Sequence, residues 1–278
     1  MVLGGGGLAG IAYIGMIRFL EIELLRKHIH HVAGTSIGAM FATMFALGWT
    51  SEEMEARVKN MLVEHGIDLL FKDVWLVLQK YGLDDGTKAT EVIAEDLGKI
   101  TFIDFEKRTG VQLVLCATHV GSMSPTYFSA ESTPNVCVID ALRASMAMPW
   151  MVCPVRIGED YYLDGGVTAN IPLEPFKDVH PQNVLLAKPY VSAAVARDPM
   201  RSPFDFTCAL VGRFLSQTMG IDQMIQKYPY FLMMQNGAIG FLPTQPKEQG
   251  FHIQLTEKQV DDAITLGYET THSKIMLS

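Results

Sequence analysis

Cysteine, basic charge and long apolar runs are all scarce in this 278-residue sequence, and each scarcity excludes a class of protein. Four cysteines in no zinc-binding pattern are too few for a disulfide scaffold and are typical of buried free thiols in a reducing compartment. Lys and Arg number 22 against 30 Asp and Glu, so the net charge of -8 lacks the basic surface of a nucleic-acid-binding protein. The same charge gives no long-range attraction to an anionic membrane, so any lipid contact should depend on apolar surface.

No apolar stretch is long enough to predict a membrane span, because the longest, 37–49, is short and contains Gly38 and Gly48. No basic leader precedes an apolar run at the N-terminus, so no secretory signal is predicted. With 49% hydrophobic and 19% charged residues, the composition is that of a globular protein. We therefore expect a cytoplasmic protein that can lie at the periphery of a membrane.

Strand and helix patterns alternate over the first two thirds of the chain. Strands are predicted at 1–3, 32–33, 111–118, 125–130, 161–163 and 183–187, and helices at 10–25, 37–46, 51–62, 88–99 and 139–148. Thr50 and Glu53 form a capping box for the helix 51–62. This alternation predicts a three-layer α/β/α fold with a central, mostly parallel sheet.

The pattern changes after Tyr190, where helices are predicted at 204–215, 221–235 and 256–275. We see no repeat, low-complexity tract or linker, so 1–278 is expected to be a single domain with 191–278 as its helical C-terminal part. The apolar residues Phe231 and Met234 have two interpretations. Core packing is favoured over contact with an acyl chain or a membrane.

A nucleophile turn is predicted at 34–38, where the sequence Gly-Thr-Ser-Ile-Gly lies between a strand and a helix. Gly34 and Gly38 would allow close backbone approach, and Ser36 would be exposed at the helix N-terminus. The helix dipole there favours a developing alkoxide. A helix-capping serine with incidental glycines would give the same pentapeptide, so the motif needs support from elsewhere.

A glycine loop at 4–10 could supply that support. Consecutive backbone N–H groups in a glycine loop at the start of a helix can hold the oxyanion that forms during acyl transfer. The loop also satisfies the dinucleotide-binding pattern Gly-x-Gly-x-x-Gly. That alternative is disfavoured because no acidic residue ends the second strand, and a phosphate-binding P-loop fails because no lysine follows Gly10.

The third segment is an aspartate at a strand end, Asp164, followed by Gly165 and Gly166 on a tight turn. Its carboxylate could take the serine proton directly if it lies within hydrogen-bond reach. Only one strand and one helix fit before the strand that leads to Ser36, whereas several strands precede the nucleophile in α/β-hydrolases. This argues against the ordinary triad fold but leaves open whether a histidine is the base. His180, His252 and His272 follow Asp164, and none lies in a glycine-rich or catalytic context, so we predict a Ser36–Asp164 dyad without histidine, and no cofactor.

These segments resemble the patatin-like phospholipases, which share the glycine loop, the Gly-x-Ser-x-Gly turn and a downstream Asp-Gly-Gly. The helical segment 141–149 and the strand exit 164–172 also look like those of the family, so the resemblance covers about residues 1–172 in register, within a core extending to about 190. It implies Ser36 as nucleophile, Asp164 as base and oxyanion donors near Gly5, Gly6 and Gly7.

The resemblance also implies a serine hydrolase that cleaves fatty-acyl esters of phospholipids or related lipids without a metal. The expected partners are therefore a lipid substrate and a membrane surface, and not a nucleic acid. An acyltransferase, or a non-catalytic lipid-binding module on the same fold, are the alternatives. Ala9 departs from the family, which usually has a basic residue at this position of the loop, and it leaves head-group preference open.

Overall fold

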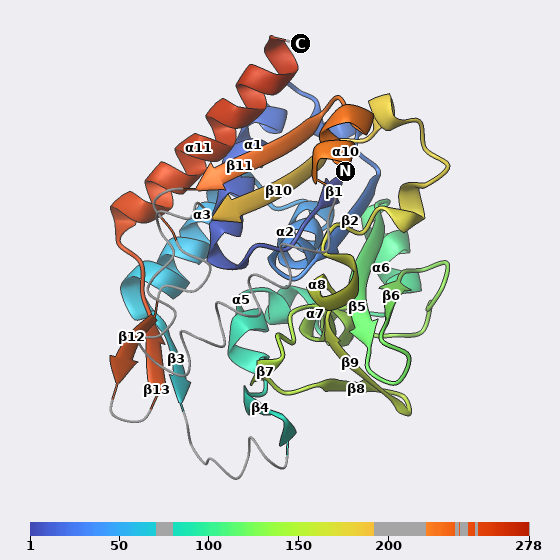
Figure 1. Cartoon of the computed structure of the whole chain (residues 1–278), viewed down its shortest axis with the longest axis vertical. Helices are drawn as coiled ribbons and strands as arrows, with labels where there is room; N and C mark the ends of the chain where they lie inside the picture. Colours follow the sequence, from blue (N-terminus) through green and yellow to red (C-terminus); the bar gives the residue numbers. More distant parts are fainter. Residues whose placement is uncertain (71–79, 192–220, 237–238, 240–243, 248–249, 278) are drawn as a thin grey trace.

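The computed structural model describes residues 1–70, 80–191, 221–236, 239, 244–247 and 250–277 (Figure 1). Its strands are β1 (Val2–Leu3), β2 (His31–Thr35), β3 (Ile67–Leu70), β4 (Gly82–Asp84), β5 (Gln112–His119), β6 (Ser124–Phe128), β7 (Trp150–Val152), β8 (Val155–Ile157), β9 (Asp160–Asp164), β10 (Leu186–Val191), β11 (Phe231–Asn236), β12 (Thr244–Lys247) and β13 (Gly250–Ile253). Its α-helices are α1 (Ala12–Ile22), α2 (Ile37–Ala46), α3 (Ser51–Lys59), α5 (Thr87–Leu97), α6 (Phe102–Thr109), α7 (Val138–Ser145), α8 (Gly166–Ala169), α10 (Ile221–Lys227) and α11 (Glu257–Met276). Short 3₁₀ or π turns are η1 (Gly7–Ile11), η2 (Arg26–His28), η3 (Asn60–His65), η4 (Glu174–Phe176) and η5 (Pro181–Asn183).

An eight-stranded mixed sheet forms the centre of the fold, in the order β11-β10-β1-β2-β5-β9-β8, with β6 also paired to β5. Strands β11, β10, β1, β2 and β5 run parallel, as predicted for the core of an α/β fold. Strands β6, β9 and β8 add antiparallel pairs. The α/β fold class is therefore confirmed, with a sheet that is parallel in its centre and antiparallel at one end.

Strand β5 is where the sheet positions the candidate site. Parallel β2 pairs with β5 up to Thr35 and Cys116, while antiparallel β9 pairs with β5 down to Asp164 and Ala117. Because β6 occupies the other edge of β5 along the same residues, β2 and β9 share one edge and run toward each other. The two strands therefore end beside each other, and the residues that follow them leave the sheet at the same place.

The two faces of the sheet bury separate hydrophobic cores, because successive side chains of a strand point to opposite faces. Along β5, Leu113 and Leu115 enter the larger core and Val114 enters the smaller one. The larger core is completed by apolar residues of α1, α2, α3, α5, α6, α7 and α11. The smaller core is covered by the segment 171–184 and by residues in and just after α10. Helical layers on both faces give the three-layer architecture (Figure 1).

Several local predictions are confirmed. Helix α2 has the predicted bounds, and the capping box of Thr50 and Glu53 is present at the start of α3. Helix α11 follows the predicted pattern and has its own capping box, formed by Thr256 and Gln259. In the N-terminal helix, a 3₁₀ turn precedes α1, so the regular helix begins later than predicted.

The C-terminal part, which was expected to be helical, also contains strands. The predicted helix 221–235 is confirmed over α10, but its last residues, from Phe231 on, belong to β11, which pairs in parallel with β10. Strands β12 and β13 form a small sheet with β3. Four apolar residues in a row fit a buried strand as well as a helix, and here their pairing with β10 makes them a strand. Phe231 and Met234 are buried, which confirms core packing for both. The predicted helix 204–215 lies outside the described residues.

Other elements were not predicted. Helix α6 and strands β3, β4, β7 and β8 lie in segments without a clear hydrophobic pattern. Most of these strands have only three or four residues, which is too short for a periodicity to be visible. Among the described helices, none combines the length and the apolar character that a bilayer span requires.

Candidate active site

The turn between β2 and α2 holds Ser36 in a strained backbone conformation. Its φ of 56° and ψ of -126° are unfavourable for an L-residue with a side chain. A Cβ added to Gly34 would lie 2.3 Å from the Gly38 carbonyl oxygen, and one added to Gly38 would lie 2.3 Å from the Leu3 oxygen. The two glycines are therefore needed for this tight turn, which leaves Ser36 partly exposed at the N-terminus of α2.

The backbone of the turn is also held from the side by helix α7. The Ser36 N–H donates to the Oγ atom of Ser145, at a distance of 2.9 Å. Ser145 is completely buried, so the acceptor of this partly buried hydrogen bond is shielded from water. The strained conformation of Ser36 is thus fixed both by close packing and by a hydrogen bond to a buried hydroxyl.

Asp164 ends β9 and is buried, with 2% of its surface exposed. Its backbone N–H donates to the Ala147 carbonyl at 2.8 Å, and its Oδ1 accepts the Gly166 N–H at 2.7 Å. Burial raises the pKa of the Asp164 carboxyl to about 6, although hydrogen bonds from Ser36 and Gly166 oppose the shift. The carboxylate is therefore ionised at neutral pH but close enough to its pKa to accept and return a proton.

The structure brings Ser36 and Asp164 together, close enough for the Ser36 side chain to oppose the burial-driven rise in the pKa of Asp164. The contact follows from the sheet, because β2 and β9 end next to each other on one edge of β5. Gly165 makes the approach close: a Cβ there would lie 2.3 Å from the Cys116 carbonyl oxygen. In the described part of the chain, the Gly166 N–H is the main-chain donor to the Asp164 carboxylate.

The glycine loop lies against the same turn. A Cβ added to Gly5 would lie 3.2 Å from the Cβ of Ser36, so the loop covers the serine closely. The Gly5 N–H donates to the Asn170 carbonyl at 3.1 Å and is thus already engaged. Gly6 and Gly7 are partly exposed, and among the described residues no carbonyl accepts either N–H. A side chain at Gly6 would collide with the ring of Pro189, at 2.5 Å.

Two polar residues beside the loop were missed by sequence analysis. Asn170 is buried and follows α8, the single helical turn that begins just after Asp164. Lys188 lies in β10, is 5% exposed, and donates from Nζ to Asn170 Oδ1 at 3.1 Å. A lysine between apolar residues of a buried strand was a visible signal in the sequence, but its contact with Asn170 depends on the sheet order.

The histidines lie apart from the pair. His252 is in the small sheet, His272 packs on Phe19, and His180 caps η5. His31 begins β2, at the opposite end from the turn. His119 places Nε2 3.2 Å from Asp160 and bonds Ser122 through Nδ1. Over the described ranges, no three His, Cys, Asp or Glu side chains form a group that could hold a metal ion.

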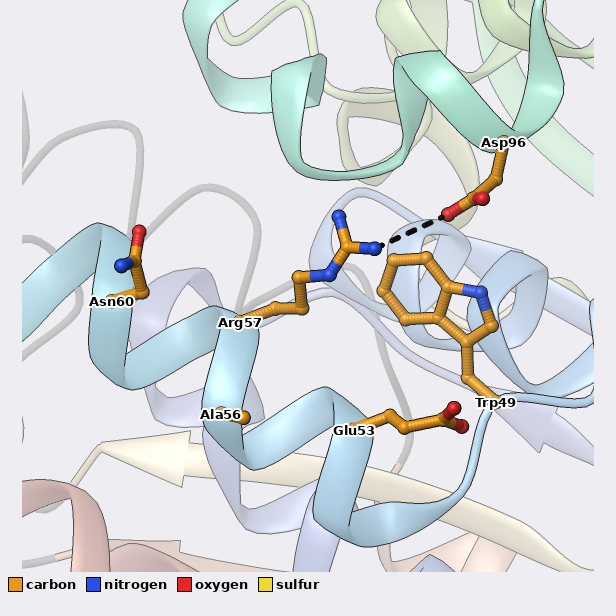
Figure 2. Close-up of a pocket in the computed structure, with 6 residues that line it drawn as sticks. All are labelled: Trp49, Glu53, Ala56, Arg57, Asn60 and Asp96. Carbon is orange, nitrogen blue, oxygen red and sulfur yellow. Dashed lines mark ion pairs between the residues drawn. The ribbon is translucent and has the colours of Figure 1, made fainter.

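A separate pocket opens between α3 and α5 (Figure 2). Its volume is about 460 Å³, and its lining residues are Trp49, Glu53, Ala56, Arg57, Asn60 and Asp96. Figure 2 shows the Arg57 guanidinium beside the Trp49 ring, with a dashed line to Asp96. The guanidinium lies 4.8 Å from the centroid of the Trp49 ring and 3.8 Å from the Asp96 carboxylate. None of the lining residues belongs to the turn, the glycine loop or the Asp164 segment, so this pocket is distinct from the candidate site.

The sequence matches the patatin-like phospholipase family over residues 1–177. Among curated proteins, the probable lipid hydrolase 463L of Invertebrate iridescent virus 6 is 24% identical over 180 residues, which cover 63% of this chain and 61% of that protein. The cGAMP-activated phospholipase of Escherichia coli (strain TW11681) is 26% identical over 206 residues, which cover 64% of this chain and 55% of that protein. The chain thus spans little more than half the length of these relatives.

A solved structure gives the same fold. VipD from Legionella pneumophila aligns with a TM-score of 0.62 and 17% identity, over 99% of this chain and 66% of that one. At this identity the likeness concerns the fold alone. Because the family match covers well over half of the residues, the chain belongs to the patatin-like phospholipase family.

Proposed function

We propose that this protein is a serine lipid acyl hydrolase in which Ser36 is the nucleophile and Asp164 is its acid-base partner. The observation that carries the proposal is the position of the Ser36 side chain beside the buried Asp164 carboxylate, close enough for it to oppose the rise in the pKa of that carboxyl. The oxyanion donors are the N–H groups of Gly6 and Gly7, which are partly exposed beside Ser36. Gly5, whose N–H is engaged by Asn170, is not one of them.

In the first step, Ser36 Oγ attacks the ester carbonyl carbon while its proton passes to Asp164. The tetrahedral oxyanion accepts hydrogen bonds from the glycine loop, each such donor being typically worth about 3–4 kcal/mol of barrier. Collapse of the intermediate breaks the bond to the alcohol oxygen, which takes the proton from Asp164. The products are the free alcohol or lysolipid and an acyl ester on Ser36.

In the second step, water attacks the acyl-enzyme carbonyl and Asp164 takes a proton from it. Ser36 leaves with that proton, and the fatty acid is released. A carboxyl with a pKa near 6 suits both roles, because it is a base at neutral pH and still returns the proton readily.

A lipid ester as substrate is supported by family membership and by the names of two relatives, a probable lipid hydrolase and a phospholipase. The glycine loop, the serine turn and Asp164 all lie within the matched residues 1–177. Among the candidates, a hydrolase is favoured over a passive lipid-binding module because Ser36 and Asp164 are both present and lie next to each other.

The test compares the wild type with Ser36→Ala and Asp164→Asn. Hydrolysis of phospholipid and neutral-lipid esters should fall by at least about 10⁴-fold in both variants, as for other residues of a catalytic unit. A fluorophosphonate probe should label the wild type and not Ser36→Ala. His252→Ala and His272→Ala serve as controls and should retain full activity.

Three results would count against this assignment. An inactive but folded His252 or His272 variant would indicate a triad in place of the dyad. Folded wild-type protein that neither hydrolyses esters nor reacts with the probe would favour a lipid-binding module. Acyl transfer to an added alcohol or lysolipid, exceeding hydrolysis, would identify an acyltransferase.

A further inference from the structure

Asn170 connects the base, the glycine loop and a buried cation. It follows the turn α8, whose first residue donates its N–H to Asp164 Oδ1. Its own carbonyl accepts the Gly5 N–H at 3.1 Å, and its Oδ1 accepts a hydrogen bond from Lys188. Thr35, the last residue of β2, also bonds α8, through Oγ1 to the Ala169 carbonyl at 3.0 Å. The position of Asn170 relative to Ser36 is therefore fixed from several sides.

Lys188 determines which way the Asn170 amide faces. An ammonium group can only donate hydrogen bonds, so the amide oxygen has to face it and the NH₂ group has to point elsewhere. The Nδ2 atom points toward the glycine loop, where a Cβ added to Gly5 would lie 3.4 Å from it. That same point lies 3.2 Å from the Cβ of Ser36. Asn170 Nδ2 and the Ser36 side chain thus flank one small space.

The Asn170 NH₂ group has donor capacity that its described surroundings do not use. Within the described residues, its side chain has one hydrogen-bond partner, Lys188, and that contact involves Oδ1. The neighbouring Gly5 N–H is engaged by the Asn170 carbonyl, which leaves one main-chain donor fewer in the glycine loop. A reacting carbonyl oxygen above Ser36 would supply an acceptor for this NH₂ group.

We propose that the Asn170 side-chain amide is a further oxyanion donor of this enzyme and that Lys188 is a positioning residue that orients it. The proposal rests on the function proposed above. Burial lowers the pKa of Lys188 to about 8, so the ammonium that holds Oδ1 is largely present at neutral pH. In the reaction no covalent bond to Asn170 forms or breaks. Its side-chain N–H donates a hydrogen bond to the oxyanion of the tetrahedral intermediate, together with the N–H groups of Gly6 and Gly7.

The first test replaces the donor. Asn170→Ala should lower kcat by about 10²-fold or more with little change in KM, because an oxyanion donor acts mainly in the transition state. Inactivation by a fluorophosphonate, whose phosphoryl oxygen occupies the same position, should slow in parallel. Asn170→Asp keeps the shape and can still pair with Lys188, so it reports on the lost donor if the alanine variant folds poorly. Asn183→Ala, an exposed asparagine in η5, is the matched control and should leave both rates unchanged.

The second test asks whether Lys188 acts through Asn170. Lys188→Met should lower kcat by roughly tenfold because the amide loses its fixed orientation. Lys188→Arg, which still donates, should recover part of that rate. The double variant Asn170→Ala/Lys188→Met should be no slower than Asn170→Ala alone. Additive losses would instead show that Lys188 has a separate structural role and would overturn its assignment.

The outcomes separate this inference from the proposed function. If the wild type hydrolyses esters, Ser36→Ala is inactive, and folded Asn170→Ala and Asn170→Asp keep the wild-type kcat, the donor assignment is wrong and the dyad stands. If the wild type shows neither hydrolysis nor probe labelling at Ser36, both fail together. A loss confined to KM would also overturn the inference, since it would indicate ground-state binding.

Discussion

The two turns that meet at the candidate site are built in opposite ways. The Ser36 turn depends on backbone strain and close approach: the residue has a φ of 56°, and Gly34 and Gly38 leave no room for a side chain. The Asp164 turn depends on burial and hydrogen bonding, with a carboxyl that is 2% exposed and bonded by Gly166. A nucleophile has to be presented to substrate, whereas a base gains from a dry environment that raises its pKa. Substitutions in the two turns should therefore lower stability or activity for different physical reasons.

The largest effect on stability is expected on the Ser36 side. Gly38→Ala would place a Cβ 2.3 Å and 2.7 Å from the carbonyl oxygens of Leu3 and Gly4, so the glycine loop would have to shift. We expect a loss of at least about 3 kcal/mol in the free energy of unfolding, measured by denaturant titration. Gly48→Ala is the control, because Gly48 has a φ of 86° but no atom near its Cβ position. It should cost only about 1 kcal/mol of backbone strain, and equal losses would contradict the packing explanation.

On the Asp164 side the effect should appear as a pH dependence of stability. Burial raises the pKa of this carboxyl from 3.8 to about 6, so between these values the folded state holds a proton that the unfolded state has lost. The raised pKa therefore adds at most about 3 kcal/mol to the free energy of unfolding below pH 3.8, and this gain is lost as the pH rises through 6. Asp164→Asn should remove this contribution. Identical pH profiles for the unfolding of wild type and Asp164→Asn would mean that the pKa is not raised.

The same shift predicts the pH dependence of activity. Asp164 accepts a proton only when ionised, so kcat/KM should fall about tenfold per pH unit below an apparent pKa near 6. The profile should be measured with an uncharged ester, so that the substrate does not titrate. An acid limb near pH 4 would indicate an Asp164 that is not desolvated in the working enzyme.

The smallest effect concerns the support for the Ser36 backbone. Ser145→Ala removes the buried acceptor of the Ser36 N–H, and we expect a loss of about 1–3 kcal/mol in stability together with a lower kcat. Thr271→Val is the control, since it removes a buried hydroxyl bonded to Gly267 in α11, away from the site. It should destabilise the protein to a similar degree without changing kcat. An unchanged kcat in a folded Ser145→Ala variant would show that the hydrogen bond does not position Ser36.

The same two turns show what the sequence reveals and what it hides. Glycines beside Ser36 and Asp164 marked both turns, because tight turns restrict the residues that fit. The meeting of the two turns was expected from the family resemblance and not from either turn alone, since it depends on β2 and β9 sharing one edge of β5. Strand order and register are tertiary properties that no local pattern encodes. The Gly5 hydrogen bond to Asn170 was hidden for the same reason.

Elements with strong local signals were predicted well, and those without them were not. Helix α2 and the capped helices α3 and α11 have long apolar patterns or capping residues. The segment of β11 was predicted as part of a helix because its continuous apolar run shows neither helical nor strand periodicity. It forms a strand because it pairs with the parallel strand β10. The assignment of Ser36 and Asp164 as catalytic residues stays a proposal, which the sheet geometry supports.

The most direct measurement of the central claim is a crystal structure of the wild type after reaction with a fluorophosphonate. We expect a covalent bond between phosphorus and Ser36 Oγ, the Asp164 carboxylate beside that oxygen, and the phosphoryl oxygen facing the N–H groups of Gly6 and Gly7. An adduct on another residue would contradict this account. So would an Asp164 carboxylate that lies out of hydrogen-bond reach of Ser36 Oγ in both the free and the labelled protein.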